Sequence, residues 1–519
     1  MNFSLIFRTI RHLCWRQAVW QVINRVYKPR LQQMPAPKHR HCLLVEPIPR
    51  MECRVHDTFS FLNISDTFRG WNDTSHGMLW AYNLNYFDFI NQRQNTTDDV
   101  NPISKSLYWI DRFIEDIAEN HVGLDPYPIA LRCINWVKFF CIHPECATSE
   151  RENSTYSQLR LLGRKLEYHL LGNHLLEDAY SLYFCSAYFE DAVLIAKARK
   201  LLFSELREQI LADGAHYEQS AMYHCILLDR LLDCYNMAVA RSLAADATVL
   251  RGYAILMLGH LESIAYRNGD IPLMNDAANG IAPDVGEIFT YAKRLGLRWQ
   301  AVPLAECGYR RLQNSIFETT IDIGEIVADY QPGHSHADVT NYELRIGGLP
   351  FVVDTGISTY DKTTRRQYER SGAAHNVVTV ADRSCAEVWG GFRVGYRYKC
   401  REIDENTYEV IGYGDATRVV RSFKISDGKF CVTDDVHSNE VCISRIHLAP
   451  GVDITKEECG ECYILIATLN AKTSVKMKIH GARAVRIIEE QASRQYNVFD
   501  AIKVVEIEFA GKLSYSLEL

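Results

Sequence analysis

The stretch that decides the fold reads Gln331-Pro332-Gly333-His334-Ser335-His336-Ala337-Asp338, the densest cluster of polar side chains in the chain. Pro332 and Gly333 favour a loop at its start. Two histidines at i and i+2 would share one face of a strand, whereas in a loop they can take separate roles. The chain changes character a little before this stretch, from helical patterns to strand patterns.

The two halves of the chain predict different kinds of domain. Between about 75 and 300, apolar residues recur at helical spacing, as in 161–176 and 187–202, and Pro and Gly separate the segments. Beyond about 315, short segments rich in β-branched and aromatic residues recur roughly every ten residues, which is typical of a β-sandwich. We therefore predict an α+β protein with three regions, namely 1–70 as a basic helix and extended connector, 71–312 as a helical domain, and 313–519 as an antiparallel β-sandwich.

Composition narrows the possible partners and location. The 519 residues contain 57 Lys and Arg against 64 Asp and Glu, a formal charge of −7 that argues against a dedicated nucleic-acid-binding protein. A local basic cleft would still suffice for an acidic polysaccharide. The apolar start of the chain ends at Arg8, which is too short for a secretory signal, and the 16 cysteines follow no disulfide framework. We expect a cytoplasmic protein, with a periplasmic location as the alternative.

Residues 1–30 combine apolar residues with six basic ones and no acidic one. This composition is typical of a basic amphipathic helix. Packing on the protein's own surface is the preferred interpretation, and contact with a membrane surface is the alternative. No oligomeric state is predicted.

Three residues of the β-rich half form a candidate metal site. His336 belongs to the opening stretch, Asp354 ends an apolar strand, and His375 begins another. A lone histidine is more often structural, but two histidines and an aspartate from adjacent strands can bind zinc or a similar metal. The set His336, Asp354 and His375 therefore predicts a metal centre.

Two polar stretches in the helical half are candidates for a site. In the first, Asn173-His174-Leu175-Leu176-Glu177, residues 173 and 177 share a helix face, although Asn173 could equally be an N-cap. The second, residues 213–224, holds many groups able to exchange protons, including Glu218 and Tyr223. A hydrogen-bonded seam between helices is an equally good interpretation of this second stretch.

Several segments, taken in order, resemble the heparinase II/III-like polysaccharide lyases. The likeness covers about 75–450 and is most specific at 334–376. The segments that carry it are 80–88, 126–136, 173–177, 213–224, 333–338, 353–356, 370–376 and 389–392. The basic N-terminal segment is similar to that of members associated with bacterial capsule and exopolysaccharide gene clusters.

This resemblance implies an (α/α) toroid followed by a β-sandwich, with the active site in the cleft between them. The implied activity is β-elimination on a polysaccharide that contains uronic acid. Tyr223 and His334 match the residues that move protons, and either Asn173 or His174 matches the group that binds the uronate carboxylate. His336, Asp354 and His375 match a structural metal site, usually zinc.

The chemistry of elimination suits these residue types. Removal of the C5 proton places negative charge on the carboxylate, where Asn173 could donate a hydrogen bond and Arg132 could supply a cation; such preorganised donors typically contribute about 2.7–4 kcal/mol each. His334 or Tyr223 would take the proton, depending on the sugar epimer, and Tyr223 would protonate the leaving oxygen.

Further candidates for substrate binding are Glu177, Arg370 and Trp389, although aromatic residues at such positions are more often core.

Two other functions remain open from the residues alone. A glycoside hydrolase would use paired carboxylates such as Glu177 and Glu218. A non-catalytic polysaccharide-binding or assembly factor could use the same fold, because fold does not fix function.

Overall fold

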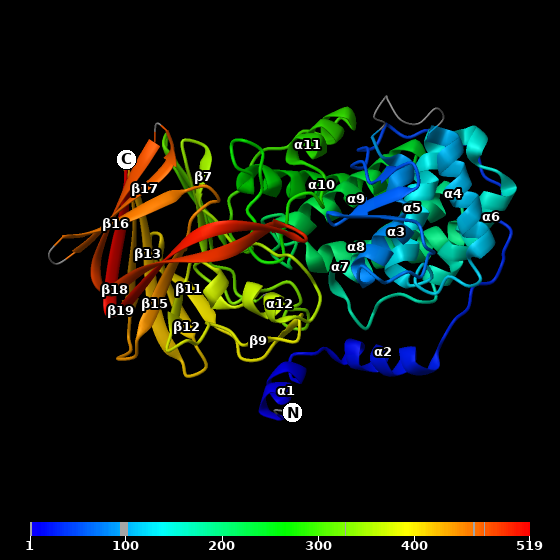
Figure 1. Cartoon of the computed structure of the whole chain (residues 1–519). Coiled ribbons are helices and arrows are strands. Elements are labelled where there is room, and N and C mark those ends of the chain that lie inside the picture. The colour runs from blue at the N-terminus through cyan, green and yellow to red at the C-terminus, as the bar shows by residue number, and fades with distance from the viewer. Residues whose placement is uncertain (1–2, 94–101, 327, 460–461, 472) are drawn as a thin grey trace.

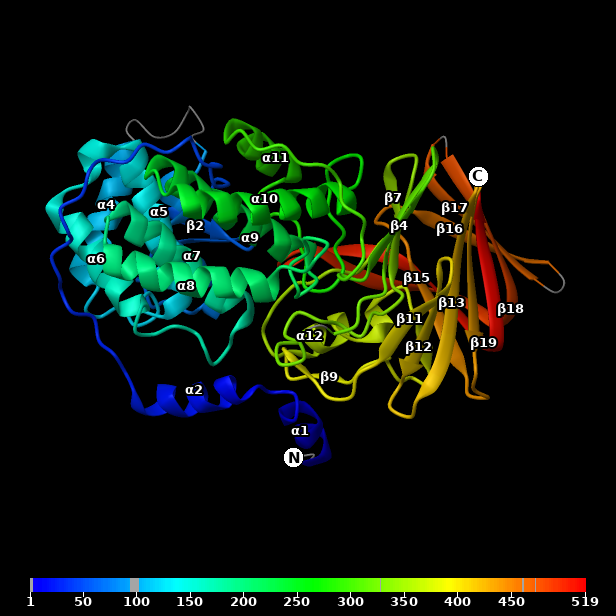
Figure 2. The same ribbon diagram turned by 180° about the vertical axis from the view of Figure 1, so that it is seen from behind.

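The computed structural model describes residues 3–93, 102–326, 328–459, 462–471 and 473–519. A helical part is followed along the chain by a β-rich part, and the two lie side by side (Figures 1 and 2). The predicted order of a helical toroid and an antiparallel β-sandwich is confirmed.

The helical part consists of long helices joined by short loops. Their caps follow the sequence, since Asp191 and Ser220 accept hydrogen bonds from the first turns of their helices. The helices are α3 (Met78–Tyr86), α4 (Pro102–Asp116), α5 (Pro126–Ile142), α6 (Ser149–Leu162), α7 (Gly172–Tyr188), α8 (Ala192–Gln209), α9 (Ala221–Ala240), α10 (Ala244–Ile264) and α11 (Val285–Arg294).

Helices α5, α7 and α9 form the inside of this part. They pack against one another, with α7 between α5 and α9. Nearly all of their side chains are buried, which explains why their apolar residues cover every face rather than one stripe. Polar residues on these helices are therefore held inside the protein, where they need partners.

The β-rich part is a sandwich of two antiparallel sheets. The smaller sheet has the order β4 (Tyr309–Gln313), β5 (Phe317–Asp322), β6 (Tyr342–Ile346), β7 (Leu349–Val352). Phe317 and Tyr342 from this sheet pack against Phe430 of the larger one, so a single core lies between the sheets.

The larger sheet includes two strands much longer than the sequence pattern indicates. Its order is β11-β12-β13-β14-β19-β18-β17-β16, and β15 pairs with both β19 and β8. The bounds are β8 (Val378–Val380), β11 (Lys399–Asp404), β12 (Thr407–Gly412), β13 (Thr417–Ser426), β14 (Lys429–Val436), β15 (Cys442–His447), β16 (Asp453–Cys459), β17 (Cys462–Asn470), β18 (Thr473–Gln495) and β19 (Val498–Glu518). The sequence pattern predicts only short strands beyond about 315, because the apolar residues of the β18–β19 hairpin alternate with many charged ones.

The tip of the β18–β19 hairpin reaches the helical part, as the long red ribbon of Figure 1 shows. Asn63 Nδ2 donates a hydrogen bond to the Tyr496 carbonyl at 2.8 Å, and the Asn279 amide donates to the Arg494 carbonyl at 2.8 Å. The last strands of the chain are thus tied to segments of the helical part.

The N-terminal segment contains two helices, α1 (Phe3–Ile10) and α2 (Trp15–Val26), and an extended stretch that leads to a small sheet. That sheet comprises β1 (Arg54–Val55), β2 (Thr58–Phe61) and β3 (Ile64–Thr67), in a region for which only an extended connector was expected. Among the described residues, no helix combines the length and the apolar character of a membrane span.

Candidate active site

Three residues predicted from distant segments meet where the two parts of the molecule face each other. Asn173 lies in the first turn of α7, Tyr223 in the first turn of α9, and His334 in the loop between β5 and β6. The Asn173 Nδ2 atom is 3.2 Å from His334 Nε2, and the rings of Tyr223 and His334 have centroids 4.2 Å apart. The structure therefore brings together an amide, a phenol and an imidazole.

A carboxylate holds Asn173 in this position. Glu218 accepts hydrogen bonds from the Asn173 backbone amide at 2.7 Å and from Asn173 Nδ2 at 2.9 Å, and its Oε2 lies 3.3 Å from His334 Nε2. Gly172 makes this approach possible, because it has φ +60° and a Cβ there would sit 2.3 Å from Glu218 Oε1.

Asp276 fixes the orientation and the tautomer of His334. Its Oδ2 lies 2.8 Å from His334 Nδ1, and Arg366 binds both carboxylate oxygens, at 2.5 and 2.7 Å. Burial acts to raise the pKa of Asp276, but Arg366 and the hydrogen bonds from His334 and His336 hold it well below its usual range. An ionised carboxylate can only accept, so Nδ1 carries a proton, and Nε2 is the ring nitrogen that faces Asn173 and Glu218.

The phenol of Tyr223 has a second phenol beside it. The hydroxyl oxygens of Tyr223 and Tyr360 are 3.0 Å apart, and both side chains are only partly buried. Burial, opposed by the hydrogen bond from Tyr360, raises the pKa of Tyr223 above its ordinary value. At neutral pH Tyr223 is thus a protonated phenol that can give up a hydrogen ion to a leaving group.

His336, Asp338 and His375 form a buried group whose ligand atoms lie within 4.8 Å of one another. His336 Nδ1, Asp338 Oδ2 and His375 Nε2 have no hydrogen-bond partner. His336 Nε2 is 2.8 Å from Asp276 Oδ1, and burial lowers the pKa of His336 to about 3, so its ring is neutral with a free lone pair. Two imidazole nitrogens and a carboxylate oxygen suit zinc or a similar cation.

Asp354, which the sequence predicted as a ligand in this group, is hydrogen-bonded to one of its histidines. Its Oδ2 is 2.8 Å from His375 Nδ1, and it accepts from Asn341 Nδ2 at 2.5 Å. A carboxylate that binds the outer nitrogen of a ligand histidine is the usual second partner in such sites. The group seen in the structure therefore takes its carboxylate from Asp338, while Asp354 orients His375.

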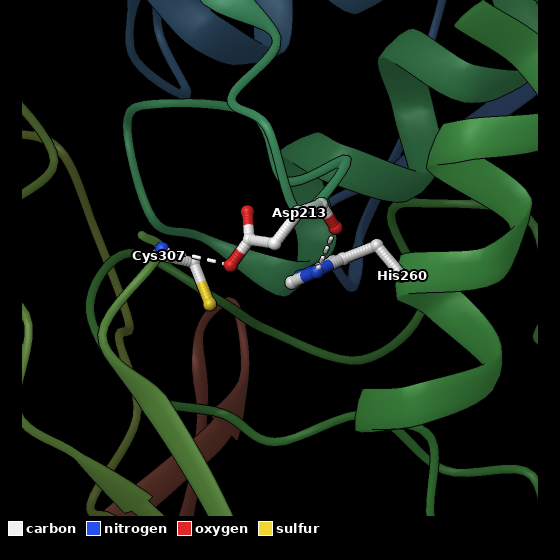
Figure 3. A group of neighbouring side chains, drawn as sticks. All are labelled: Asp213, His260 and Cys307. Atoms are coloured by element: carbon white, nitrogen blue, oxygen red, sulfur yellow. Dashed lines mark hydrogen bonds between the residues drawn. The ribbon is translucent and has the colours of Figure 1, made fainter. Parts of the chain in front are cut away.

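A second cluster of metal-ligating residue types lies elsewhere, at Asp213, His260 and Cys307 (Figure 3). Asp213 Oδ2 accepts from the backbone amides of Ala305 and Cys307 at 3.0 and 2.9 Å. His260 Nδ1 is 3.1 Å from the Asp213 carbonyl oxygen. These contacts tie the segment before β4 to α10, so the cluster has a structural explanation that needs no metal.

The predicted role of Arg132 in substrate binding is corrected by its position. Arg132 is fully buried on α5, and its guanidinium donates to Gln158 Oε1 and to the carbonyls of Asn85 and Gly123, at 2.7 to 2.9 Å. All three guanidinium nitrogens serve the helical core, and no exposed surface remains for a polysaccharide.

Arg370 supports the fold, and Trp389 is only partly buried. Buried Arg370 donates to the carbonyl of Ser335 at 2.7 Å, which supports the loop that carries His334. Trp389 is half-buried, and its Nε1 donates to Thr9 Oγ1 of α1 at 3.1 Å. The predicted substrate contact is thus replaced by a supporting role for Arg370 and stays a prediction for Trp389.

His174 and Glu177 differ in their access to the site. His174 is partly exposed, and its Nδ1 lies 3.1 Å from Glu167 Oε2; burial acts to lower its pKa, but Glu167 raises it overall. Glu177 is fully buried, 3.5 Å from the Arg230 guanidinium, and burial raises its pKa to about 7. With Glu177 enclosed and Glu218 bound to Asn173, the two do not form an open carboxylate pair of the kind a hydrolase needs.

Sequence reasoning missed Asp276 and Tyr360, and it treated Asp338 only as part of a motif. Asp276 lies in the irregular segment between α10 and α11, where no periodicity marks it. Its only signal is the run Asn275-Asp276 within a short polar stretch.

The helical part and the β-rich part each match a model of the same protein family. Residues 153–281 match the family model described as heparinase II/III N-terminus, and residues 297–515 match heparinase II/III-like, C-terminal. No curated protein matches the chain.

Solved structures share the fold at low identity. A crystal structure of heparinase III is 14% identical, with a TM-score of 0.63 over 80% of this chain and 73% of that one. A mutant of the heparan sulfate lyase HepC from Pedobacter heparinus is 15% identical, with a TM-score of 0.57 over 97% of this chain and 87% of that one. A further heparinase III structure is 14% identical, with a TM-score of 0.55 over 86% of this chain and 75% of that one.

Proposed function

The chain belongs to the heparinase II/III-like family and is a polysaccharide lyase, and from this premise we propose that it cleaves a uronic-acid-containing polysaccharide by β-elimination. The observation that carries the proposal is the meeting of His334 Nε2, the Asn173 amide and the Tyr223 phenol. A heparan-like glycan or an acidic capsule or exopolysaccharide would provide the required uronate.

His334 is proposed as the base. Its Nε2 lone pair takes the proton from C5 of the uronate, and the electron pair of the C5–H bond moves towards C4 and onto the carboxylate. Asp276, ionised and bonded to Nδ1, stabilises the imidazolium that forms. Asn173, whose Nδ2 lies 3.2 Å from His334 Nε2, is proposed to turn its side-chain N–H to this charge when the substrate is bound, and such a donor typically contributes about 2.7–4 kcal/mol.

Tyr223 is proposed as the acid. As the C4=C5 double bond forms, the bond from C4 to the glycosidic oxygen breaks, and that oxygen takes the phenolic proton. The raised pKa of Tyr223 favours the protonated form that this step needs. Tyr360, whose hydroxyl is 3.0 Å away, can donate to the phenolate that results.

His174 is proposed to assist with the substrate carboxylate. It follows Asn173 on α7, is partly exposed and has a raised pKa, so it can carry positive charge near the site. Asn173, in contact with His334, is assigned the closer role.

His336, Asp338 and His375 would hold a zinc ion, whose positive charge would fix these side chains in place. His336 and His334 bind the two oxygens of one carboxylate, that of Asp276. Fixing His336 therefore fixes the orientation of His334, which makes the proposed role of the metal site structural.

The test is ultraviolet absorbance during incubation with a panel of uronate polysaccharides. Elimination creates a double bond conjugated to the carboxylate, which absorbs, whereas hydrolysis does not. We expect the signal from the wild type, its loss in His334→Ala and Tyr223→Phe, and its retention in the exposed controls His437→Ala and Tyr108→Phe.

Two results would contradict the proposal. New reducing ends without the absorbance would indicate a hydrolase. Binding of a polymer that is never cleaved would favour an assembly factor.

A further inference from the structure

Helix α2 exposes an apolar stripe to solvent. Trp15, Val19, Val22 and Val26 follow the spacing i, i+4, i+7 and i+11, which places them on one face of the helix. Their side chains are between 43% and 83% exposed. A helix that packs on its own protein normally buries this face.

The opposite face of α2 is the one that contacts the protein, and it combines polar and apolar side chains. Buried Gln17 donates from Nε2 to the carbonyls of Leu170 and Tyr330, at 3.2 and 3.0 Å. The Arg16 guanidinium lies 4.2 Å from the centre of the Tyr168 ring, and the rings of Trp20 and Tyr168 have centroids 4.8 Å apart. Helix α2 thus packs on the protein by this face and leaves its apolar stripe in solvent.

Helix α1 also exposes an apolar stripe. Phe3, Phe7 and Ile10, at i, i+4 and i+7, are 55% to 81% exposed. On the side that contacts the protein, Arg8 pairs with Glu387 at 2.9 Å, and Leu5 and Ile6 are half-buried. Both views place α1 and α2 along the same edge of the molecule (Figures 1 and 2).

The chain segment that carries these stripes has charges of one sign, whereas its acidic partners Glu387 and Asp329 lie on the main body of the protein. Residues 1–45 contain eight Lys and Arg and no Asp or Glu, in a chain whose formal charge is −7. Arg11, Arg25 and Lys28 are exposed beside the apolar residues. A surface of this kind attracts anions and repels a second copy of itself.

We propose that α1 and α2 form a docking face for a lipid bilayer that contains anionic headgroups, with the helices lying in the plane of the membrane surface. Exposed aromatic and aliphatic residues flanked by Arg and Lys are what such interfacial helices use. At about 1.5 Å per residue, helices of 8 and 12 residues are far too short to cross a bilayer of about 30 Å.

The helix that carries this face is bound, by its other side, to segments that lead into the candidate active site. Gln17 of α2 bonds to Leu170 and Tyr330, which are three and four residues from Asn173 and His334. Docking would therefore hold the site near the membrane, where it would act on glycan at the lipid surface. This consequence rests on the proposed function, whereas docking itself does not.

The experiment is flotation of the full chain with vesicles of phosphatidylcholine alone or of phosphatidylcholine mixed with phosphatidylglycerol. We expect binding to the mixed vesicles that weakens with salt. The variant Trp15→Ser/Val22→Ser should lose at least tenfold in affinity, and Arg11→Gln/Arg25→Gln/Lys28→Gln about 100-fold. The control Val193→Ser/Val239→Ser removes two equally exposed apolar residues on other helices and should bind as the wild type does.

Three results would overturn the proposal. One is equal binding of the wild type to both kinds of vesicle, and another is wild-type binding by the Trp15 variant. The third is self-association of the wild type that the Trp15 variant abolishes, without vesicle binding by either. Lyase activity on a soluble polymer is measured in parallel, so that loss of the proposed reaction with vesicle binding intact leaves the docking face established.

Discussion

The two buried clusters of histidine and aspartate differ in how their polar atoms are used. In the cluster of His336, Asp338 and His375, one polar atom of each side chain has no hydrogen-bond partner, and the ligand atoms of the three residues lie within 4.8 Å of one another. In the cluster of Asp213, His260 and Cys307, the Asp213 carboxylate already binds the amides of residues 305 and 307. The two clusters contain similar residue types at similar distances. The polar atoms left without a hydrogen-bond partner are therefore what mark His336, Asp338 and His375 as the candidate metal site.

The clusters differ also in their connection to the proposed base. Asp276 joins His336 to His334, whereas His260 contacts the backbone of Asp213 and is not bonded to the site residues. Four predictions test this contrast, from the largest expected effect to the smallest.

The first concerns catalysis. His334→Ala should lower kcat by about a hundred- to ten-thousand-fold, because a general base typically contributes that much. His260→Ala should leave the kcat of the folded enzyme within a few-fold of the wild type. Kinetics on a cleaved polymer measure both, and a similar loss in the two variants would remove the functional distinction between the clusters.

The second concerns pH. Burial lowers the pKa of His260 to about 4 from 6.5, so the unfolded chain binds the proton more readily between these values. The contribution of His260 to stability is present above pH 6.5 and is lost as the pH falls towards 4, by up to about 3 kcal/mol. Urea unfolding at several pH values measures the free energy of unfolding, which should fall less steeply with acidification in His260→Gln than in the wild type. Parallel pH profiles for the two proteins would contradict this prediction.

His375 is expected to act in the opposite direction in metal-free protein. Burial acts to lower its pKa, but Asp354 raises it to about 9. Its contribution to stability is therefore fully present below the unfolded value of 6.5 and is lost as the pH rises through 9.

The third concerns metal affinity. Asp354→Asn weakens the carboxylate that orients His375, and loss of such a partner typically costs 10–100-fold in affinity. Metal content after dialysis against graded chelator should fall in this variant. It should be unchanged in Asp213→Asn, and a fall there instead would reverse the assignment of the two clusters.

The fourth is the smallest. Cys307→Ser keeps a hydrogen-bond acceptor for the Tyr309 amide, which lies 3.3 Å from the sulfur. The free energy of unfolding should fall by about 1 kcal/mol or less, with no change in bound metal. Loss of metal from this variant would make the second cluster a ligand set after all.

The sequence predicted the architecture and the meeting of Asn173, Tyr223 and His334, because each lies in a motif whose order along the chain is distinctive. It could not place Arg132 or Arg370, since a guanidinium in a motif bonds equally well to a sugar acid or to backbone carbonyls. It missed Asp276 because that residue is in an irregular segment and gains its role only through folding. It named Asp354 and not Asp338 as the carboxylate beside the histidines, whereas the structure places both near His375, because two carboxylates near one histidine cannot be ranked without coordinates.

The hairpin that ends at Tyr496 has a consequence for biosynthesis. Tyr496 packs with Met222, Leu273 and Ala277 of the helical part, and Asn63 bonds to its carbonyl across 433 positions of sequence. A ribosome releases the helical segments long before it makes this tip. The helical part must therefore wait, with an apolar patch uncovered, until Tyr496 has been made, and a chain that stalls before this residue would expose that patch to chaperones.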